Sequence, residues 1–231
     1  MGSTVQTKTG LTGNQLKIIA MIAMTCDHVG LQLFPQRIWL RWIGRLALPI
    51  YAFMIAEGCR HTHSRKKYLL RLAAMAALCQ IVYFFAMNSL YQCILVTFSL
   101  SVSLIMALDE AKKQRSKAAW GVAYGLLAAV FFVCVVLPLL LPKTDFAIDY
   151  GIWGVMLPVF IYFGKDQWAW LTNGLVLLTL RYGSSQLPAL LAVPILMLYN
   201  GRRGRANIGK LFYWYYPLHL VVIYGLSLLF E

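Results

Sequence analysis

The feature that most constrains this chain is a succession of apolar stretches, each close to the length of a membrane-spanning helix. Such a helix needs about 20 mostly apolar residues. The chain is 60% hydrophobic and 13% charged, whereas a soluble domain is about 45–50% apolar and about 25% charged. We therefore predict an all-α, polytopic transmembrane helical bundle of about nine spans. The nine apolar segments cover about residues 14–34, 38–58, 67–87, 90–110, 118–141, 148–163, 168–182, 187–199 and 210–230.

The number of crossings is the least constrained part of this prediction. The segments at 148–163, 168–182 and 187–199 are short for a span, and one of them could be re-entrant. Counts from seven to ten are therefore compatible with the sequence. Little of the 231-residue chain lies outside the segments, so we expect one transmembrane domain over 14–231. Residues 1–13 lack the apolar core of a signal peptide, and the distribution of basic residues predicts that they form a short cytoplasmic tail.

Basic residues are distributed unevenly between the connecting loops. Cytoplasmic loops of membrane proteins are enriched in Lys and Arg, so the bias predicts a cytoplasmic N-terminus. The same bias accounts for the net charge of +13 without a nucleic-acid partner. Three loops carry most of the 21 Lys and Arg, and they contain Arg60, Arg65, Lys66, Lys67 and Arg71, then Lys112, Lys113, Arg115 and Lys117, then Arg202, Arg203, Arg205 and Lys210.

Neither cysteine nor histidine spacing predicts a metal site. His61 and His63 have no further ligands at metal-binding spacing, so we expect no metal. The cysteines are scattered and form no CxxC pair, which favours small core residues over a disulfide framework or a zinc site. They are Cys26, Cys59, Cys79, Cys93 and Cys134.

Several ionisable residues lie inside the apolar segments. Asp27 and His28 occur in MTCDHVG, residues 24–30. Such groups cost about 2.5–3.5 kcal/mol each at a helix centre on insertion scales, and they usually mark function. Asp27 and Arg45 have similar depths at a rise of about 1.5 Å per residue, and a short loop joins their segments. We therefore predict an ion pair between them. Arg41, four residues before Arg45, shares its helix face.

The two histidines in apolar segments are candidate general bases. His28 lies about 100° around the helix from Asp27, so the two side chains face different directions. We expect His28 to face a cavity and accept a proton from an acceptor group. The alternative is a buried histidine hydrogen-bonded to an oxygen. His219 follows Pro217, which disturbs helical hydrogen bonding, and it is the second candidate base or a partner of His28.

Two further motifs lie near the ends of the segments. YNGRRG, residues 199–204, is a glycine-rich basic turn on the predicted cytoplasmic side. With the basic loop that begins at Arg60 it could bind phosphates, because arginine pairs with them bidentately. Ordinary cytoplasmic charge enrichment is an equally good explanation for each residue. DYGIWG, residues 149–154, places Asp149 at the predicted outer membrane edge.

These blocks occur in the order NQLKIIAMIAMTCDHVG, IGRLALPIYAFMIAEGCRHTHSRKKYLLRL, DYGIWG, YNGRRG and KLFYWYYPLHL, and they cover about residues 14–222. In this set and order the chain resembles the TraX family. The resemblance implies a multi-pass protein of the bacterial inner membrane, in contact with lipid. It also implies an acetyltransferase that uses cytoplasmic acetyl-CoA as co-substrate. The acceptor it implies is an amine or hydroxyl of a peptide, a pilin-like protein or a cell-surface glycan.

The resemblance, together with the positions of these residues in the apolar segments and loops, suggests roles for individual residues. The catalytic candidates are Asp27, His28, Arg45 and His219. The candidates for binding acetyl-CoA are Arg60, Arg65, Lys66, Arg71, Tyr199, Asn200, Arg202 and Arg203. The candidates for binding the acceptor are Arg41, Glu57, Asp149 and Tyr216. The alternative is a non-enzymatic transporter or assembly factor, in which the Asp/His/Arg cluster relays protons.

Overall fold

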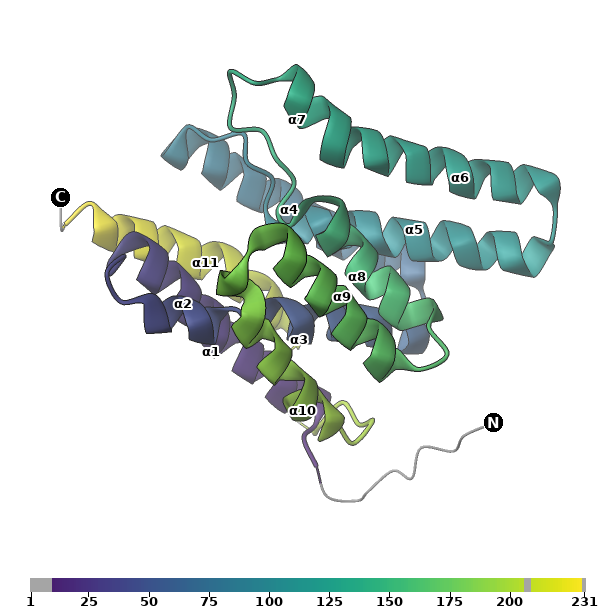
Figure 1. Cartoon of the computed structure of the whole chain (residues 1–231), viewed down its shortest axis with the longest axis horizontal. Coiled ribbons are helices and arrows are strands. Elements are labelled where there is room, and N and C mark those ends of the chain that lie inside the picture. The colour runs from purple at the N-terminus through teal and green to yellow at the C-terminus, as the bar shows by residue number, and fades with distance from the viewer. Residues whose placement is uncertain (1–9, 206–208, 230–231) are drawn as a thin grey trace. The chain divides into compact units, whose positions relative to one another are not determined.

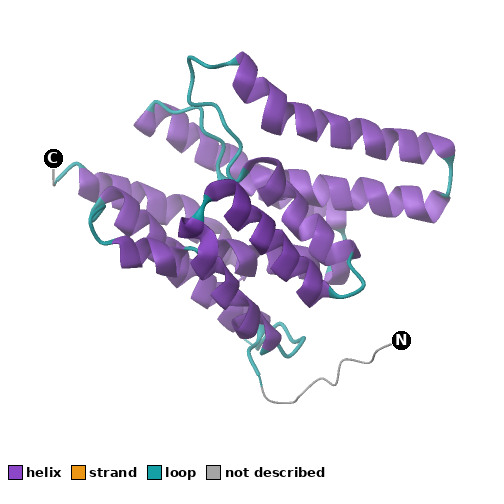
Figure 2. Cartoon of the chain, in the orientation of Figure 1, coloured by secondary structure: helices purple, strands orange, loops and turns teal. Residues whose placement is uncertain are grey.

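The structure is a computed structural model that describes residues 10–205 and 209–229. Helices and loops make up the described part, in which no strand occurs (Figure 2). The predicted all-α class is therefore confirmed. The helices are α1 (Gly13–Gln32), α2 (Ile38–Gly44), α3 (Ala47–His61), α4 (Arg65–Met87), α5 (Ile94–Gln114), α6 (Lys117–Phe131), η1 (Phe132–Val136), α7 (Leu137–Leu140), α8 (Gly151–Phe163), α9 (Gln167–Tyr182), η2 (Ser184–Leu191), α10 (Ala192–Met197) and α11 (Gly209–Ser227).

The chain divides into two compact units. Met1–Met54 and Leu171–Glu231 form one, called here the terminal unit, and Ile55–Trp170 form the other, called here the central unit. The boundary falls within α3 and α9. The expectation of one domain over 14–231 stays a prediction. Of the predicted tail, residues 1–9 lie outside the described part.

Every apolar segment of the sequence coincides with helix, but not every helix is suited to span a membrane. Four helical stretches in the described residues are long and apolar enough, and they are Ile38–His61, Arg65–Phe85, Ile94–Gln114 and Lys117–Leu140. Helices such as α8, with 13 residues, and α9, with 16, are short. The structure thus supports four candidate spans among the residues it describes, and it supports neither nine spans nor a cytoplasmic N-terminus.

The first candidate span is interrupted. The segment 38–58 was expected to be one helix, whereas α2 ends at Gly44 and α3 begins at Ala47. Arg45 and Leu46 form a turn between them. Helix α2, which ends at this turn, packs alongside α1 (Figure 1).

Two glycines allow α1 and α2 to approach closely. A Cβ atom at Gly44 would lie 2.3 Å from the Cβ atom of Asp27, and one at Gly30 would lie 2.7 Å from the Cβ atom of Leu40. Real side chains do not tolerate such distances. Small residues commonly permit this kind of backbone approach between membrane helices. Gly30 and Gly44 therefore set the separation at which Asp27 meets α2.

The start of α1 is tied to the loop after α10. Thr12 caps α1 and forms a reciprocal capping box with Gln15. The amide N–H groups of Gly13 and Asn14 donate to the carbonyls of Arg202 and Arg203, at 2.8 and 2.9 Å. Two amide N–H groups of the first turn, which have no acceptor within the helix, are therefore hydrogen-bonded to the YNGRRG loop.

In the central unit, loops between the helices are also joined by polar contacts. The Asp145 carboxylate accepts hydrogen bonds from the Ser89 hydroxyl and, at 2.9 Å, from the Leu90 amide. These bonds lower the pKa of Asp145. The Thr97 hydroxyl donates to the Asp149 carbonyl at 2.8 Å, which joins α5 to the turn that precedes α8.

Replacing Gly44 with Ala tests the close approach of α1 and α2. We expect Gly44→Ala to lower the free energy of unfolding by about 1–3 kcal/mol, because the new methyl group overlaps Asp27. Gly121→Ala in α6 is the matched control, because a Cβ there meets no described atom within 4 Å. Thermal unfolding in detergent should show a loss for Gly44→Ala alone. Equal melting temperatures for both variants would contradict the packing.

Candidate active site

Helix α1 divides its polar residues between two faces in the terminal unit. Thr25 and His28, three residues apart, meet residues of α11, whereas Asp27 meets residues of α2. This agrees with the predicted rotation of about 100° between Asp27 and His28. One short stretch of α1 therefore contributes to two different polar clusters.

The two histidines of the apolar segments are in direct contact. Nδ1 of His28 lies 2.8 Å from Nε2 of His219, and the two rings stack at 4.9 Å between centroids. His219 is buried and His28 is half-buried. Nδ1 of His219 lies 3.0 Å from the carbonyl oxygen of Tyr215. The expected partnership of His219 with His28 is thus present, while the role of either as a base stays a prediction.

These contacts determine which nitrogen carries each proton. The Tyr215 carbonyl can only accept, so Nδ1 of His219 carries the hydrogen and donates it. In neutral His219, Nε2 is then an acceptor, so Nδ1 of His28 is the donor between the rings. Neutral His28 therefore has its lone pair on Nε2. This nitrogen receives no hydrogen bond from the residues that the structure describes, and it can accept a substrate proton.

A hydroxyl pair lies beside the histidines on the same two helices. The Thr25 hydroxyl donates to the Met21 carbonyl at 2.9 Å, so the Tyr215 hydroxyl must donate to the Thr25 oxygen. The Tyr215 ring is also stacked on His219, with centroids 5.3 Å apart. Buried Tyr216 also meets the His219 ring, in an edge-on contact with 5.3 Å between centroids. Together these contacts fix the His219 ring on α11, which continues as helix through Pro217.

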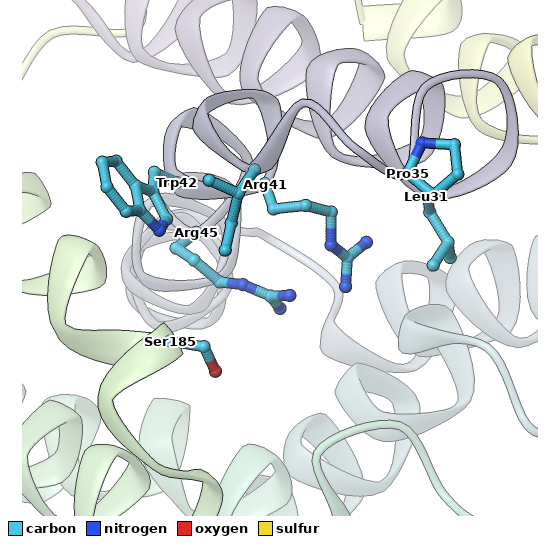
Figure 3. Close-up of a pocket in the computed structure, with 7 residues that line it drawn as sticks. Leu31, Pro35, Arg41, Trp42, Arg45 and Ser185 are labelled. Atoms are coloured by element: carbon cyan, nitrogen blue, oxygen red, sulfur yellow. The ribbon is translucent and has the colours of Figure 1, made fainter.

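The second cluster joins Asp27 to α2. Arg41 Nη1 lies 3.0 Å from Asp27 Oδ2, and Arg45 Nη2 lies 3.8 Å from Asp27 Oδ1. The predicted Asp27–Arg45 ion pair is therefore present, but Arg41 makes the shorter contact. Figure 3 shows both guanidinium groups directed into one pocket, which Ser185 of η2 faces. The pocket has a volume of about 310 Å³.

Two arginines predicted to bind acetyl-CoA have partners within the central unit. Arg60 donates to Glu57 and Gln167, each at 2.8 Å, and to the carbonyls at 161 and 162. Arg65 donates to Asp109, to the Tyr162 hydroxyl and to the Cys59 carbonyl. These bonds occupy the guanidinium donors that phosphates would need. Lys66 and Arg71 are exposed.

Two predicted acceptor-binding carboxylates also belong to the central unit. Glu57 is buried and lies 2.8 Å from Arg60 and 3.3 Å from the ring of His61. Asp149 accepts a hydrogen bond of 2.6 Å from the Tyr91 hydroxyl. Both carboxylates thus have structural contacts of their own, and their predicted role in binding an acceptor is untested.

The YNGRRG loop combines buried and exposed residues. Asn200 is buried, donates from Nδ2 to the Gly10 carbonyl at 3.0 Å and accepts from the Arg202 amide at 3.0 Å. The Tyr199 ring packs edge-on against Phe53 at 5.7 Å. Asn200 therefore shapes the loop with both ends of its amide, whereas the side chains of Arg202 and Arg203 are exposed on it.

Sequence reasoning missed the residues that orient the histidines. Thr25 precedes His28 by three residues and Tyr215 precedes His219 by four, so each pair shares a helix face. That spacing is the only sequence signal for them. Ser185, which lines the pocket beside Arg41 and Arg45, had no signal because it comes from a distant short helix.

Several helices of the described part are long and apolar enough to span a membrane, and a histidine pair lies between two helices. These features define the class of polytopic membrane proteins with a polar internal site. The family model described as TraX protein matches residues 12–227, so the chain belongs to the TraX family. No solved structure matches the chain.

Two curated proteins are similar to the chain. It is 26% identical to a probable fimbrial assembly protein, FimC of serogroup H1, from Dichelobacter nodosus, over 90% of this chain and 93% of that protein. It is 53% identical to an uncharacterized protein, RP591, from Rickettsia prowazekii (strain Madrid E), over 16% of this chain and 15% of that protein. The first likeness covers nearly the full length of both chains.

The proton positions in the histidine pair are directly testable. We expect ¹⁵N spectra of histidine-labelled protein to show His28 protonated on Nδ1 and His219 also on Nδ1, because the Tyr215 carbonyl fixes the second ring. His219→Ala should shift the signals of His28 by removing its acceptor. Substituting the exposed His61 should leave them unchanged. Signals of His28 that do not respond to His219→Ala would contradict the pairing.

Proposed function

We propose that this protein is an integral membrane acetyltransferase that moves an acetyl group from acetyl-CoA to an amine or hydroxyl. The observation that carries the proposal is the hydrogen bond of 2.8 Å between Nδ1 of His28 and Nε2 of His219. It leaves Nε2 of His28 as an oriented acceptor for a proton. A histidine whose tautomer is fixed by a second group is an arrangement suited to general base catalysis.

In the proposed reaction, the nucleophile of the acceptor attacks the acetyl carbonyl carbon as Nε2 of His28 removes its proton. A bond between the acceptor and the acetyl carbon forms, and the carbon–sulfur bond to coenzyme A breaks. The proton then passes from His28 to the departing thiolate, which leaves as the free thiol of coenzyme A. His219 acts as a positioning residue, because its Nε2 accepts from His28 and shares the positive charge that develops there.

The structure favours some of the predicted acetyl-CoA contacts over others. Arg202 and Arg203 expose their side chains on a loop whose backbone is held by α1, which suits them to bind phosphates. Lys66 and Arg71 are exposed as well. Arg60 and Arg65 would first have to give up their bonds to Glu57, Gln167 and Asp109. We therefore place Arg202 and Arg203 first among the phosphate contacts, and Tyr199 and Asn200 shape their loop.

The proposal for the acceptor rests on the name of a similar protein. The similar protein of Dichelobacter nodosus is named as a probable fimbrial assembly protein, so a pilin-like polypeptide is our first choice of acceptor. In this proposal the chain is a multi-pass protein of the bacterial inner membrane with a cytoplasmic N-terminus. The name of that relative also favours a second candidate function, that of a fimbrial assembly factor without catalytic activity.

Binding and turnover of acetyl-CoA by the purified protein in detergent separate these two functions. We expect wild type to bind acetyl-CoA and to hydrolyse it slowly when no acceptor is present. His28→Ala should lower hydrolysis by at least about 100-fold, the lower range for loss of a general base, while binding is retained. The control His63→Ala alters an exposed histidine and should retain both.

Arg202→Gln with Arg203→Gln tests the phosphate contacts. We expect this double variant to bind acetyl-CoA about tenfold more weakly, because charge-assisted bonds to phosphate are lost. Arg115→Gln, an exposed residue of the α5–α6 turn, is the control and should bind normally. A folded wild type that fails to bind acetyl-CoA would overturn the enzyme proposal and favour the assembly factor.

A further inference from the structure

The pocket beside Asp27 carries an excess of positive charge. Arg41 and Arg45 both line it, and among the residues that the structure describes Asp27 is the carboxylate that forms ion pairs with them. The side chains of Arg41 and Arg45 are 26% and 11% exposed. Two guanidinium groups and one carboxylate leave one net positive charge, and Arg41 keeps part of its surface accessible. The pocket is therefore suited to an anion with one negative charge.

Apart from Ser185, the remaining lining is apolar and is partly exposed at the protein surface. Leu31, Ile38 and Trp42 line the same pocket, and their exposed fractions are 50%, 58% and 49%. Trp39, on the same helix, is 52% exposed. Exposed tryptophans and aliphatic residues on a membrane protein are typical of contact with lipid near the membrane surface. An anion that binds here meets arginines at one end and apolar side chains at the other.

We propose that the pocket between α1, α2 and η2 binds the phosphate headgroup of an anionic membrane phospholipid. Arg41 and Arg45 contact the phosphate, and Leu31, Ile38 and Trp42 contact the glycerol and the first methylenes. Basic pockets between membrane helices bind anionic headgroups by this combination of charge and apolar surface. The pocket of about 310 Å³ holds a headgroup rather than a whole lipid. This site is separate from the histidine pair and does not depend on acetyl transfer.

Native mass spectrometry of the full chain in a neutral detergent tests the site. We expect phosphatidylglycerol to bind in preference to phosphatidylcholine with the same acyl chains, because only the first is anionic. Arg41→Gln should weaken the binding of phosphatidylglycerol about tenfold, the loss expected for a charge-assisted contact. Arg37→Gln is the matched control, because Arg37 is exposed, lies four residues earlier and is outside the pocket lining. This control should bind as wild type does.

A second variant keeps the test independent of the ion pair. Ser185 lines the pocket from η2 and has no ion pair with Asp27. Ser185→Trp should fill the space and lower the binding of phosphatidylglycerol while the Asp27–Arg41 contact stays intact. Normal lipid binding by both Ser185→Trp and Arg41→Gln would overturn the proposal. If Arg41→Gln does not fold, normal binding by Ser185→Trp alone overturns it.

Inorganic phosphate distinguishes a lipid from a soluble anion. The apolar lining predicts that inorganic phosphate, at the concentration of the lipid, does not displace phosphatidylglycerol. Displacement at equal concentration would show that the pocket recognises phosphate alone, and it would overturn the lipid assignment. Equal binding of phosphatidylcholine and phosphatidylglycerol would overturn the role of charge.

Discussion

The contact of Asp27 with two arginines determines the arrangement of the terminal unit. A charged residue in the middle of an apolar helix is expensive unless it has a partner. Asp27 meets this requirement through Arg41 on α2 and Arg45 in the turn that follows α2, and Gly44 makes the approach sterically feasible. Once this face of α1 is directed at α2, the helical repeat turns Thr25 and His28 toward α11. The position of the histidine pair thus follows from the ion-paired face of α1.

In the histidine pair, unlike many buried histidine contacts, the direction of hydrogen-bond donation is fixed. Two hydrogen bonds run in series, from His28 to His219 and from His219 to the Tyr215 carbonyl. Because the carbonyl can only accept, the donor of each bond is fixed when both rings are neutral. The Thr25–Tyr215 hydroxyl pair holds the same two helices beside it. The outcome is a single ring nitrogen, Nε2 of His28, whose lone pair is left for chemistry. In the proposed acetyl transfer, this nitrogen accepts the proton of the acceptor group.

Helix geometry applied to the sequence predicted the features that involve one helix, or two helices joined by a short loop. The all-α class follows from the lengths of the apolar segments. The Asp27–Arg45 ion pair and the separation of Asp27 from His28 follow from rise and rotation per residue, whereas the shorter contact of Asp27 with Arg41 was not predicted. The break at Arg45 did not follow, because LRWIGRLALP, residues 40–49, contains no proline before Pro49 to end the helix. The contact of His28 with His219 joins positions 191 residues apart, and the sequence suggested it only as one of two roles for His219, because sequence gives no register between α1 and α11. Arg60 illustrates the same limit, because its partner Gln167 is 107 residues away.

Chemical rescue measures the central claim, that Nε2 of His28 is the proton acceptor. Acetyl transfer from labelled acetyl-CoA to a simple amine would be followed in the His28→Ala protein as free imidazole is added. The arrangement predicts that imidazole restores transfer in this variant, because a small base can occupy the vacated space next to His219. Transfer at the wild-type rate by His28→Ala without imidazole would contradict it, and the histidine pair would then be a structural contact.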